Sequence, residues 1–471
     1  MKMHHSTMSR RTFMKVLGLG GATAGAATLA SPVIFHDLDE VMASPLAERK
    51  LPFWAKESDK PTVEIDWERM QRFDGTQTVF NPPSYGKAIG KEEEERLRKI
   101  GGLFGEGGYG RLIKENKPGN RHRDFAMSLG ARFFQHPDRY AKWKPFLGPQ
   151  LAPTPEQLGI PKYEGKPEEN SRMVTAALKF YGAATVGMVE LDENTRKLFY
   201  AHDAFDKKEV LFSDVDEPQE TDTQRVIPNK ANWVIVFSVR MAPANIARAP
   251  YPASQATVGL AYAEGAIIAN RLQEFLRALG YHCMAESNIL GSLANSGGFG
   301  VMAGIGELSR LNRLITPEYG PIVRVFKVVT DLPLAPTKPI NAGIWEFCRT
   351  CKKCAEACPS KTLSMSDPTW EIKGFWNNPG VKAYYEDAPK CLTYWRESGG
   401  SCIICFAVCP FTKQDRSFMH AFIQKTIATT PVFNGMFRQM DDAFGYGKLK
   451  DPESWWDLDL PPFGYDSSSR S

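Results

Sequence analysis

The chain lacks the sequence signals of nucleotide and nucleic-acid binding. Its 58 Lys and Arg nearly balance its 54 Asp and Glu, which leaves a net charge of +4 over 471 residues and gives no electrostatic argument for a nucleic-acid partner. Neither a P-loop nor a dinucleotide fingerprint is present. The glycine-rich stretch 101–110 has no Lys-Ser or Lys-Thr after it and no clear strand before it, so a loop is expected there.

Long hydrophobic runs are absent after residue 43. A membrane-spanning helix needs about 20 consecutive apolar residues, and no later segment reaches that length. Once residues 1–43 are removed, the chain is therefore expected to be soluble or peripheral.

The first 43 residues have the pattern of a secretory leader. Residues 9–13 are Ser-Arg-Arg-Thr-Phe, and a short apolar stretch rich in Gly and Ala follows over residues 16–30. Paired arginines select the twin-arginine route, which exports proteins already folded around their cofactors. We predict a twin-arginine signal peptide at residues 1–43 that is cleaved after Ala43, with cleavage after Ala30 as the weaker alternative.

Cysteine is scarce outside two short segments, which hold eight of the nine cysteines. The ninth, Cys283, is expected to be a buried apolar residue. The two runs are Cys348-x2-Cys351-x2-Cys354-x3-Cys358-Pro and Cys391-x10-Cys402-x2-Cys405-x3-Cys409-Pro.

This spacing predicts two [4Fe-4S] clusters, with the last cysteine of each run binding the cluster of the other run. A disulfide framework suits short secreted domains, and zinc sites do not explain the Cys-Pro ends. The wide gap between Cys391 and Cys402 departs from a plain ferredoxin. The predicted ligand sets are Cys348, Cys351, Cys354 and Cys409 for one cluster, and Cys391, Cys402, Cys405 and Cys358 for the other.

Periodicity predicts a mixed core before the cysteine runs. Strands are expected at 232–240, 281–286 and 323–332, a long amphipathic helix at 255–279 that ends at Gly280, and a glycine loop at 291–300. We therefore expect an α+β fold. The expected parts are the signal peptide 1–43, an irregular wrapping region 44–160, a catalytic core 161–342, a ferredoxin-like module 343–413 and a C-terminal extension 414–471.

A core of this size suggests a second redox centre, and the residues resemble a known family. The chain is similar to the catalytic subunits of respiratory reductive dehalogenases, and in its core and cluster segments also to epoxyqueuosine reductases, although the leader argues against the latter. The matching segments are the leader, 275–281, 303–310, 315–321, 327–334 and 347–360.

The resemblance implies a nitroreductase-like core that binds a corrinoid (cobalamin) base-off, with no protein ligand on cobalt. No mature histidine lies in an Asp-x-His-x-x-Gly motif, which fits this family and equally fits a protein without a corrinoid. The resemblance also implies organohalide respiration at the outer face of the cytoplasmic membrane, with a small integral-membrane anchor subunit and a quinone-linked electron donor chain. Members of this family often form dimers, although the sequence does not show a dimer. Nucleic acid is not expected as a partner.

Reductive removal of halide needs two electrons and one proton. A tyrosine can supply the proton, and a nearby arginine lowers the pKa of a tyrosine from about 10 by stabilising phenolate. By resemblance, Tyr262 matches the family's acid, Asn288 its asparagine and Arg324 its arginine. On the helical stripe alone Tyr262 fits an ordinary core tyrosine, and Tyr251, Tyr281 and Arg310 are the alternatives for these roles.

Further residues are candidates for contacts with the cofactor or the substrate. Gly297 and Gly298 could let the backbone approach the corrinoid, and Trp395 could wall the cavity; an ordinary turn and plain packing are the alternatives. The aromatic residues of the wrapping region that could line an apolar pocket are Phe104, Tyr109, Phe125 and Phe133.

Two other functions stay open at this point. An exported iron–sulfur electron-transfer subunit would hold iron without a corrinoid. An epoxyqueuosine reductase-like enzyme would be cytoplasmic and would present a basic face to tRNA. The specific organohalide is not predicted by the sequence.

Overall fold

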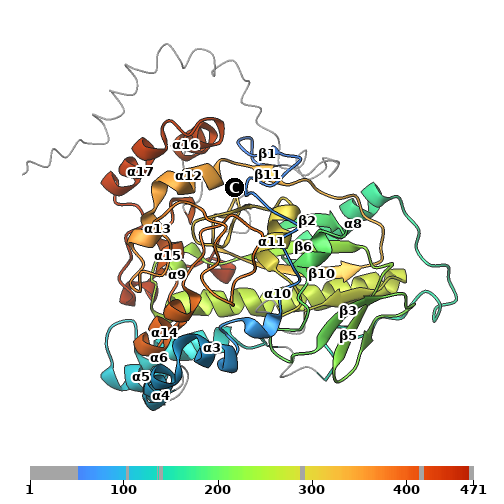
Figure 1. Cartoon of the computed structure of the whole chain (residues 1–471), viewed down its shortest axis with the longest axis horizontal. Coiled ribbons are helices and arrows are strands. Elements are labelled where there is room, and N and C mark those ends of the chain that lie inside the picture. The colour runs from blue at the N-terminus through green and yellow to red at the C-terminus, as the bar shows by residue number, and fades with distance from the viewer. Residues whose placement is uncertain are drawn as a thin grey trace, which may run out of the picture. The chain divides into compact units, whose positions relative to one another are not determined.

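A four-stranded antiparallel sheet forms the centre of the protein (Figure 1). The computed structural model describes residues 51–101, 106–134, 136, 142–286, 292–412 and 418–465. The predicted leader and its cleavage sites lie outside these residues. The strand order is β2-β6-β10-β7, and the strands are β2 (Thr185–Glu190), β6 (Trp233–Arg240), β7 (Cys283–Ala285) and β10 (Val323–Thr330).

Both faces of this sheet are buried because its central strands are apolar throughout. Along β6, Ile235 and Phe237 face one hydrophobic cluster, whereas Val234 and Val236 face the other, as the two-residue period of a strand requires. Phe237 lies directly opposite Phe326 of β10, and their rings stack with centroids 5.3 Å apart. The predicted strands at 232–240, 281–286 and 323–332 are confirmed, the last two being shorter than expected.

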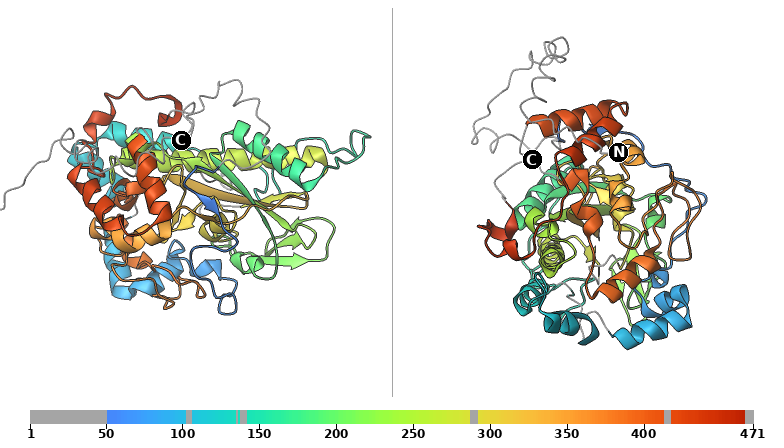
Figure 2. Two further views of the ribbon diagram at one scale, coloured as in Figure 1. Left: turned by 90° about the horizontal axis from the view of Figure 1, so that it is seen from above. Right: turned by 90° about the vertical axis from the view of Figure 1, so that its left-hand side faces the viewer.

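The helix α10 (Pro252–Leu279) covers one face of the sheet and contacts β6, β7 and β10. Pro252 starts it in the position that proline favours. Gly280 ends it with φ 89°, the left-handed conformation of a helix C-cap. Figure 2 views this long helix nearly end-on in its right panel. The predicted helix at 255–279 and its stop are confirmed. On the same face lies α8 (Pro167–Tyr181).

The opposite face is covered by a helix where we expected a glycine loop. Residues Ser296–Met302 form α11, which contacts β2, β6 and β10. The side chain of Asn295 caps it by accepting a hydrogen bond from the Gly298 N–H at 2.9 Å. Phe299 is fully buried in the core. The expectation was wrong because packing of Phe299 and the cap outweigh the low helix propensity of the glycines.

The region 44–160 is more regular than its composition indicated. Pro82 starts α3 in the first turn, where proline is tolerated. Glu106–Gly110 is a π-helical turn, so the loop expected at 101–110 is wrong for these residues. The helices of this region are α3 (Pro82–Ile89), α4 (Lys91–Ile100), η3 (Glu106–Gly110), α5 (Arg111–Glu115) and α6 (His122–Ala131). The expectation of an irregular chain was therefore wrong for the described part of residues 82–131, whereas the described residues of this region on either side of them contain little regular structure.

Short helices gather at one end of α10 and hold the cysteine runs (Figure 1). They are α9 (Pro243–Ile246), α12 (Ile344–Cys351), α13 (Lys353–Glu356), α14 (Ala388–Ser398) and α15 (Ile404–Ala407). The C-terminal helices α16 (Phe418–Thr429) and α17 (Asn434–Ala443) contact α12. Gly320, at φ 61°, fits against the backbone of Phe411, where a Cβ would meet the Phe411 oxygen at 2.0 Å. Core and module therefore meet in tight contact.

The remaining elements are short. A three-stranded sheet is formed by β3 (Glu209–Ser213), β5 (Gln224–Pro228) and β4 (Gln219–Glu220). Two strand pairs join β1 (Lys56–Glu57) to β11 (Ile340–Asn341), and β8 (Glu307–Leu308) to β9 (Leu314–Ile315). The 3-10 helices are η2 (Gly75–Gln77), η4 (Thr195–Leu198), η5 (Pro410–Thr412), η6 (Glu453–Trp455) and η7 (Pro462–Gly464).

All described residues belong to one unit, residues 50–471. Within it, no helix that the structure describes has the length and apolar character to span a bilayer. The α+β class is confirmed by the mixture of sheet and helices.

Candidate functional site

Two short helices place the cysteines of the first run. Cys348 and Cys351 lie on α12, and Cys354 lies on α13. Lys352, with φ 53°, separates the two helices in the left-handed region and turns the chain between them. The three cysteines line one cavity together with Cys409, the last cysteine of the second run.

The second run is placed by α14 and α15. Cys391 lies on α14, Cys402 precedes α15, and Cys405 lies on α15. Because α13 contacts α15, the two runs are adjacent in space although about 40 residues separate their starts. Cys283 is buried elsewhere, as expected.

The thiolates interact as two groups. Cys409 interacts electrostatically with Cys348, Cys351 and Cys354, which together we name the first cluster site. Cys358 interacts with Cys391 and Cys402, and both of these interact with Cys405. We name these last four the second cluster site. The structure therefore brings together the two sets that the crossed spacing predicts.

Burial makes most of these thiols hard to ionise without iron. It raises the pKa of Cys354 and of Cys391 to about 12. Cys358 differs: burial opposes the change, but hydrogen bonds from Thr362 and Ser360 lower its pKa to about 7. No three His, Cys, Asp or Glu side chains in the described ranges could hold a single metal ion. A cubane cluster needs no such group because its thiolates bind separate irons.

Tyr262 and Arg324 are brought into contact between the helix and the sheet. Tyr262 lies on α10 and is partly buried, and Arg324 lies on β10. The guanidinium carbon of Arg324 lies 5.0 Å from the centroid of the Tyr262 ring. Phe326 completes the contact, with its ring edge-on to Tyr262 at 6.2 Å. The predicted acid and its predicted cation are thus neighbours.

The same arginine reaches the cluster module. The guanidinium carbon of Arg324 lies 5.6 Å from the ring centroid of Phe406, a buried residue of α15. Phe406 directly follows Cys405 of the second cluster site. Arg324 therefore contacts both the predicted proton donor and the residue after a cluster cysteine, between α10, β10 and α15.

A cavity lies one helical turn along α10 from Tyr262. Its polar wall includes Lys327, which forms a buried ion pair with Glu286 and donates a hydrogen bond to Ser296 Oγ at 2.8 Å. Burial raises the pKa of Glu286 and lowers that of Lys327, and their mutual attraction opposes both shifts. The lining residues are Pro145, Ala266, Ala269, Asn270, Ala285, Glu286, Phe326 and Lys327.

The other predicted site residues have mixed outcomes. Asn288 lies outside the described residues. Trp395 lies on α14, one turn after Cys391, and its ring centroid is 6.1 Å from that of Phe80. Gly297 and Gly298 belong to α11. A Cβ on Gly297 would meet only Asn295 Oδ1, at 3.5 Å, whereas the N–H of Gly298 is already used by the helix cap.

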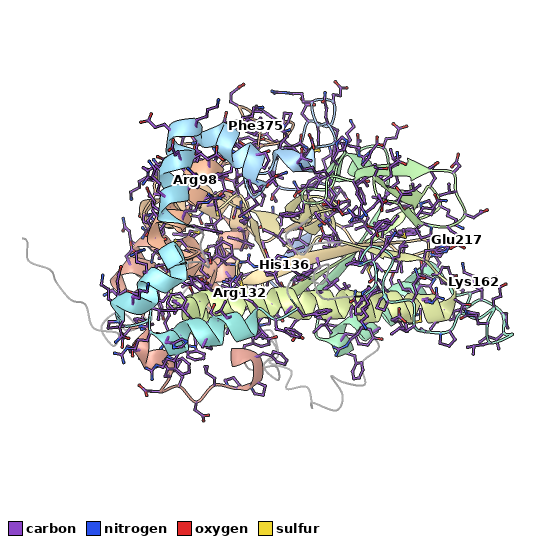
Figure 3. The ribbon with its side chains drawn as sticks, turned by 90° about the horizontal axis from the view of Figure 1, so that it is seen from below. Arg98, Arg132, His136, Lys162, Glu217 and Phe375 are labelled. Carbon is purple, nitrogen blue, oxygen red and sulfur yellow. The ribbon has the colours of Figure 1, made fainter. Side chains whose placement is uncertain are left out.

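The alternatives for the acid lie away from this contact. Tyr251 precedes α10, and Tyr281 follows it at the far end, where its hydroxyl donates to the Tyr163 carbonyl at 2.8 Å. Lys162, labelled in Figure 3, lies over the Tyr281 ring there, whereas Arg132, also labelled, contacts Gln255 near the other end of α10.

The aromatic residues of the wrapping region do not form one pocket wall. Tyr109 and Phe125 are buried against each other with ring centroids 4.3 Å apart. Phe133 is largely exposed, and Phe104 lies outside the described residues.

Sequence reasoning missed the ion pair of Glu286 with Lys327 and the position of Arg310 beside the first cluster site. Lys327 left a signal, because it is a charged residue at a buried position of the largely apolar strand β10. Glu286 and Arg310 left none, since their importance depends on which distant residues surround them.

Comparison with known proteins supports the family resemblance over most of the chain. Residues 50–334 match the family model described as reductive dehalogenase subunit, and residues 347–412 match a 4Fe-4S double cluster binding domain. The chloroethene reductive dehalogenase of Dehalococcoides mccartyi (strain VS) is 30% identical over 99% of both chains. The tetrachloroethene reductive dehalogenase of Sulfurospirillum multivorans is 31% identical over 98% of this chain and 95% of that protein.

Solved structures show the same fold at lower identity. A reductive dehalogenase structure, described as suggesting a mechanism for B12-dependent dehalogenation, matches with a TM-score of 0.63 and 23% identity. The match covers 86% of this chain, which spans only 50% of the length of that one.

Proposed function

Because the chain belongs to the reductive dehalogenase family, we propose that it replaces the halogen of a small organohalide with hydrogen. The reaction consumes two electrons and one proton and releases halide. One observation supports this activity most strongly: Arg324 contacts both Tyr262 and Phe406, the residue after a cluster cysteine. A proton donor and an electron supply therefore converge on the same place.

In this proposal Tyr262 is the proton donor. Its O–H bond breaks as the new C–H bond forms at the carbon that loses halide, which leaves a phenolate oxygen on Tyr262. The neighbouring guanidinium of Arg324 stabilises that negative charge. Phe326 and Phe406 border the pair with apolar surface, and a less polar surrounding strengthens the attraction between phenolate and guanidinium.

We also propose a corrinoid in a nitroreductase-like core. The bound corrinoid would supply the low-potential reductant that cleaves the carbon–halogen bond. Three polar side-chain atoms among the residues described above are buried without a hydrogen-bond partner in the described part of the chain, and such a cofactor would offer them partners. These buried atoms are Arg324 Nε, Trp395 Nε1 and Glu286 Oε2. Base-off binding is proposed from the family resemblance, and Gly297 is a candidate backbone contact because the space around its Cβ position is largely open.

The arrangement of the module indicates the order of electron transfer. The second cluster site lies beside the Tyr262–Arg324 contact through Cys405 and Phe406. The first cluster site adjoins it, because Cys354 interacts with Cys405. We propose that electrons enter at the first site and leave through the second.

Export and membrane association are part of the proposal. The leader at residues 1–43 supports export by the twin-arginine route to the outer face of the cytoplasmic membrane. There the family resemblance implies a small membrane anchor subunit, a quinone-linked donor chain and dimeric assembly. Replacing Arg10 and Arg11 together by Lys should keep the protein in the cytoplasmic fraction; wild-type protein confined to that fraction would contradict the proposal.

The relatives named for chloroethene and tetrachloroethene support a small apolar chlorinated substrate. The test is anaerobic turnover with a low-potential dye as donor and a panel of chlorinated ethenes, ethanes, propanes and aromatics. We expect one chloride for every two electrons consumed with at least one class. Protein that holds both clusters and a corrinoid but releases no chloride from any class would contradict the activity.

The two other functions are less well supported. A bare electron-transfer subunit does not explain why residues 50–334 match the dehalogenase family ahead of the cluster domain. An epoxyqueuosine reductase does not explain similarity to chloroethene dehalogenases over 99% of the chain.

A further inference from the structure

Arg310 is a buried cation in the loop after β8, and its side chain is almost completely enclosed, with 1% exposure. Its Nε donates to the backbone oxygen of Cys348 at 2.9 Å. Its Nη1 donates to the backbone oxygens of Ser364 at 2.6 Å and Ser366 at 2.9 Å, and its Nη2 to that of Arg349 at 3.3 Å. Backbone carbonyls therefore occupy most of the five N–H groups of the guanidinium.

All of these partners are uncharged. The guanidinium carbon also lies 4.1 Å from the ring centroid of Tyr384, which attracts a cation through its π face. Among the ion pairs formed by residues in the described ranges, none includes Arg310. Burying a charge costs several kcal/mol unless an opposite charge compensates it. An anion is therefore expected close to Arg310.

The anion can be identified from the cavity beside the guanidinium. Arg310 lines it together with the four sulfur ligands of the first cluster site, and its charge acts on Cys348 and Cys354. Thiolates around an iron–sulfur cluster leave the assembly negatively charged. We infer that Arg310 is the buried counter-ion of the cluster in the first cluster site and that it raises the reduction potential of this cluster.

The direction of the change in reduction potential follows from the charges of the cluster and of Arg310. Reduction adds one electron to the cluster and no proton, so the negative charge grows and the attraction of a fixed cation grows with it. Net charge and hydrogen bonding around the sulfurs are the means by which a protein sets cluster potentials. Because Arg310 is enclosed, water screens this attraction little.

Arg310 differs from the other cations near the cysteines. Lys352 also lines the cavity of the first cluster site but is partly exposed to solvent, which screens its charge. Lys353, between two ligands of the first cluster site, forms an ion pair with Asp441. Arg313, near the second cluster site, pairs with Glu386 at 2.6 Å, and Cys391 and Cys405 feel the charges of both partners. Each pair has little net charge, whereas Arg310 has a full positive charge.

The test is a redox titration of the anaerobically purified holoprotein, in which EPR follows the two cluster reductions. Arg310→Gln removes the charge and keeps hydrogen-bond donors. We expect Arg310→Gln to lower the midpoint potential of one of the two cluster reductions. With the variant poised at the wild-type midpoint of that step, its ratio of reduced to oxidised cluster should be at least tenfold lower than in the wild type, and a tenfold change corresponds to a shift of about 59 mV for a one-electron couple. In Arg310→Lys, which keeps the charge, the ratio of reduced to oxidised cluster at the same potential should be close to that of the wild type.

Arg313→Gln is the matched control. It removes a guanidinium from the second cluster site and leaves Glu386 unpaired. It should therefore lower the midpoint potential of the other reduction and leave the potential of the Arg310-dependent reduction unchanged. An unchanged potential in an iron-replete Arg310→Gln protein would overturn the inference. Loss of iron from both Arg310 variants would assign this side chain a structural role and overturn it as well. The inference depends on the cluster module and not on the organohalide, so failure of the dehalogenase assay would leave it standing.

Discussion

At the scale of single residues, the proposed reaction depends on the contact between Tyr262 and Arg324. A tyrosine on an apolar helical stripe is usually a core residue, and Tyr262 does pack against Phe326. Tyr262 also has the Arg324 guanidinium over its ring, and this cation contacts Phe406 next to a cluster cysteine. In the proposed reaction it would stabilise the phenolate that remains after proton donation.

Replacing Tyr262 by Phe should remove the proton donor and leave the packing in place. We expect turnover to fall by about 10²–10⁴-fold, the usual contribution of a general acid, with iron and corrinoid content unchanged. Tyr281→Phe is the matched control, because it deletes the same hydroxyl at the far end of α10 and should retain nearly full activity. Full turnover by Tyr262→Phe would reject the assignment.

The crossed ligand scheme makes a sharp prediction for two neighbouring cysteines. Cys354→Ala and Cys358→Ala should each remove about half of the iron, since each cysteine belongs to a different cluster. Combining Cys358→Ala with Cys391→Ala should cost no more iron than the single change, whereas combining it with Cys354→Ala should remove nearly all. The reverse pattern would contradict the scheme, and Cys283→Ala should leave iron unchanged.

Residue spacing predicted the cysteine sets because cluster ligands lie within two short segments. It could not predict that Arg310 lies against Cys348 or that Arg324 lies against Phe406. Those contacts depend on how the loop after β8 and strand β10 meet the cysteine module, and no local pattern records this.

At the scale of elements, α10 supports the site by packing closely on β10. Gly265 lets the helix approach, since a Cβ there would lie 2.0 Å from the Phe326 ring. Gly265→Ala should therefore overpack the core and lower the free energy of unfolding by about 1–3 kcal/mol. Gly130→Ala on α6 has open space around its Cβ and should stabilise by about 0.4–1 kcal/mol. Equal effects in chemical denaturation would contradict this account of the packing.

The start of β7 should respond to pH through His282. Its hydrogen bond with Asp331 Oδ2, at 3.0 Å, raises the His282 pKa, burial opposes the rise, and Glu217 adds to it. Lys162 near Asp331 and the buried thiol of Cys283 are the other titratable groups there. A raised pKa means that the fold favours protonated His282, so this stability is present below about pH 6.5 and is lost as pH rises through the folded-state pKa.

His282→Asn should therefore reduce stability more at pH 5.5 than at pH 9, as measured by denaturant unfolding. His122→Asn on the exposed start of α6 is the control and should show no such difference. A cost for His282→Asn that is independent of pH would reject the ion-pair explanation.

Regular periodicity was enough to predict β6, α10 and β10, because their apolar residues follow the strand and helix periods over many positions. It failed for α11 and for the helices between Pro82 and Ala131. In α11 a cap at Asn295 and the burial of Phe299 compensate for three glycines. In the N-terminal region, the many prolines and glycines led us to predict an irregular chain. Several of them instead lie at helix ends, where proline is favoured at the start of a helix.

At the scale of the whole molecule, the cluster module and the α+β core act together. Arg324 bridges α10 and α15, and Gly320 fits closely on the backbone after Cys409. The two cluster sites adjoin, and the second borders the contact where Tyr262 would give its proton. A bare electron carrier has no need of such a junction, which is why we place the reaction there.

The central claim is that one chain holds two [4Fe-4S] clusters and one corrinoid at this junction. Its most direct test is the cobalt and iron content of the anaerobically purified protein after corrinoid reconstitution. The account predicts cobalt near one per chain and iron near eight, the content of two four-iron clusters. Iron near eight without cobalt would contradict it, favour an electron-transfer protein, and remove the catalytic roles given to Tyr262 and Arg324.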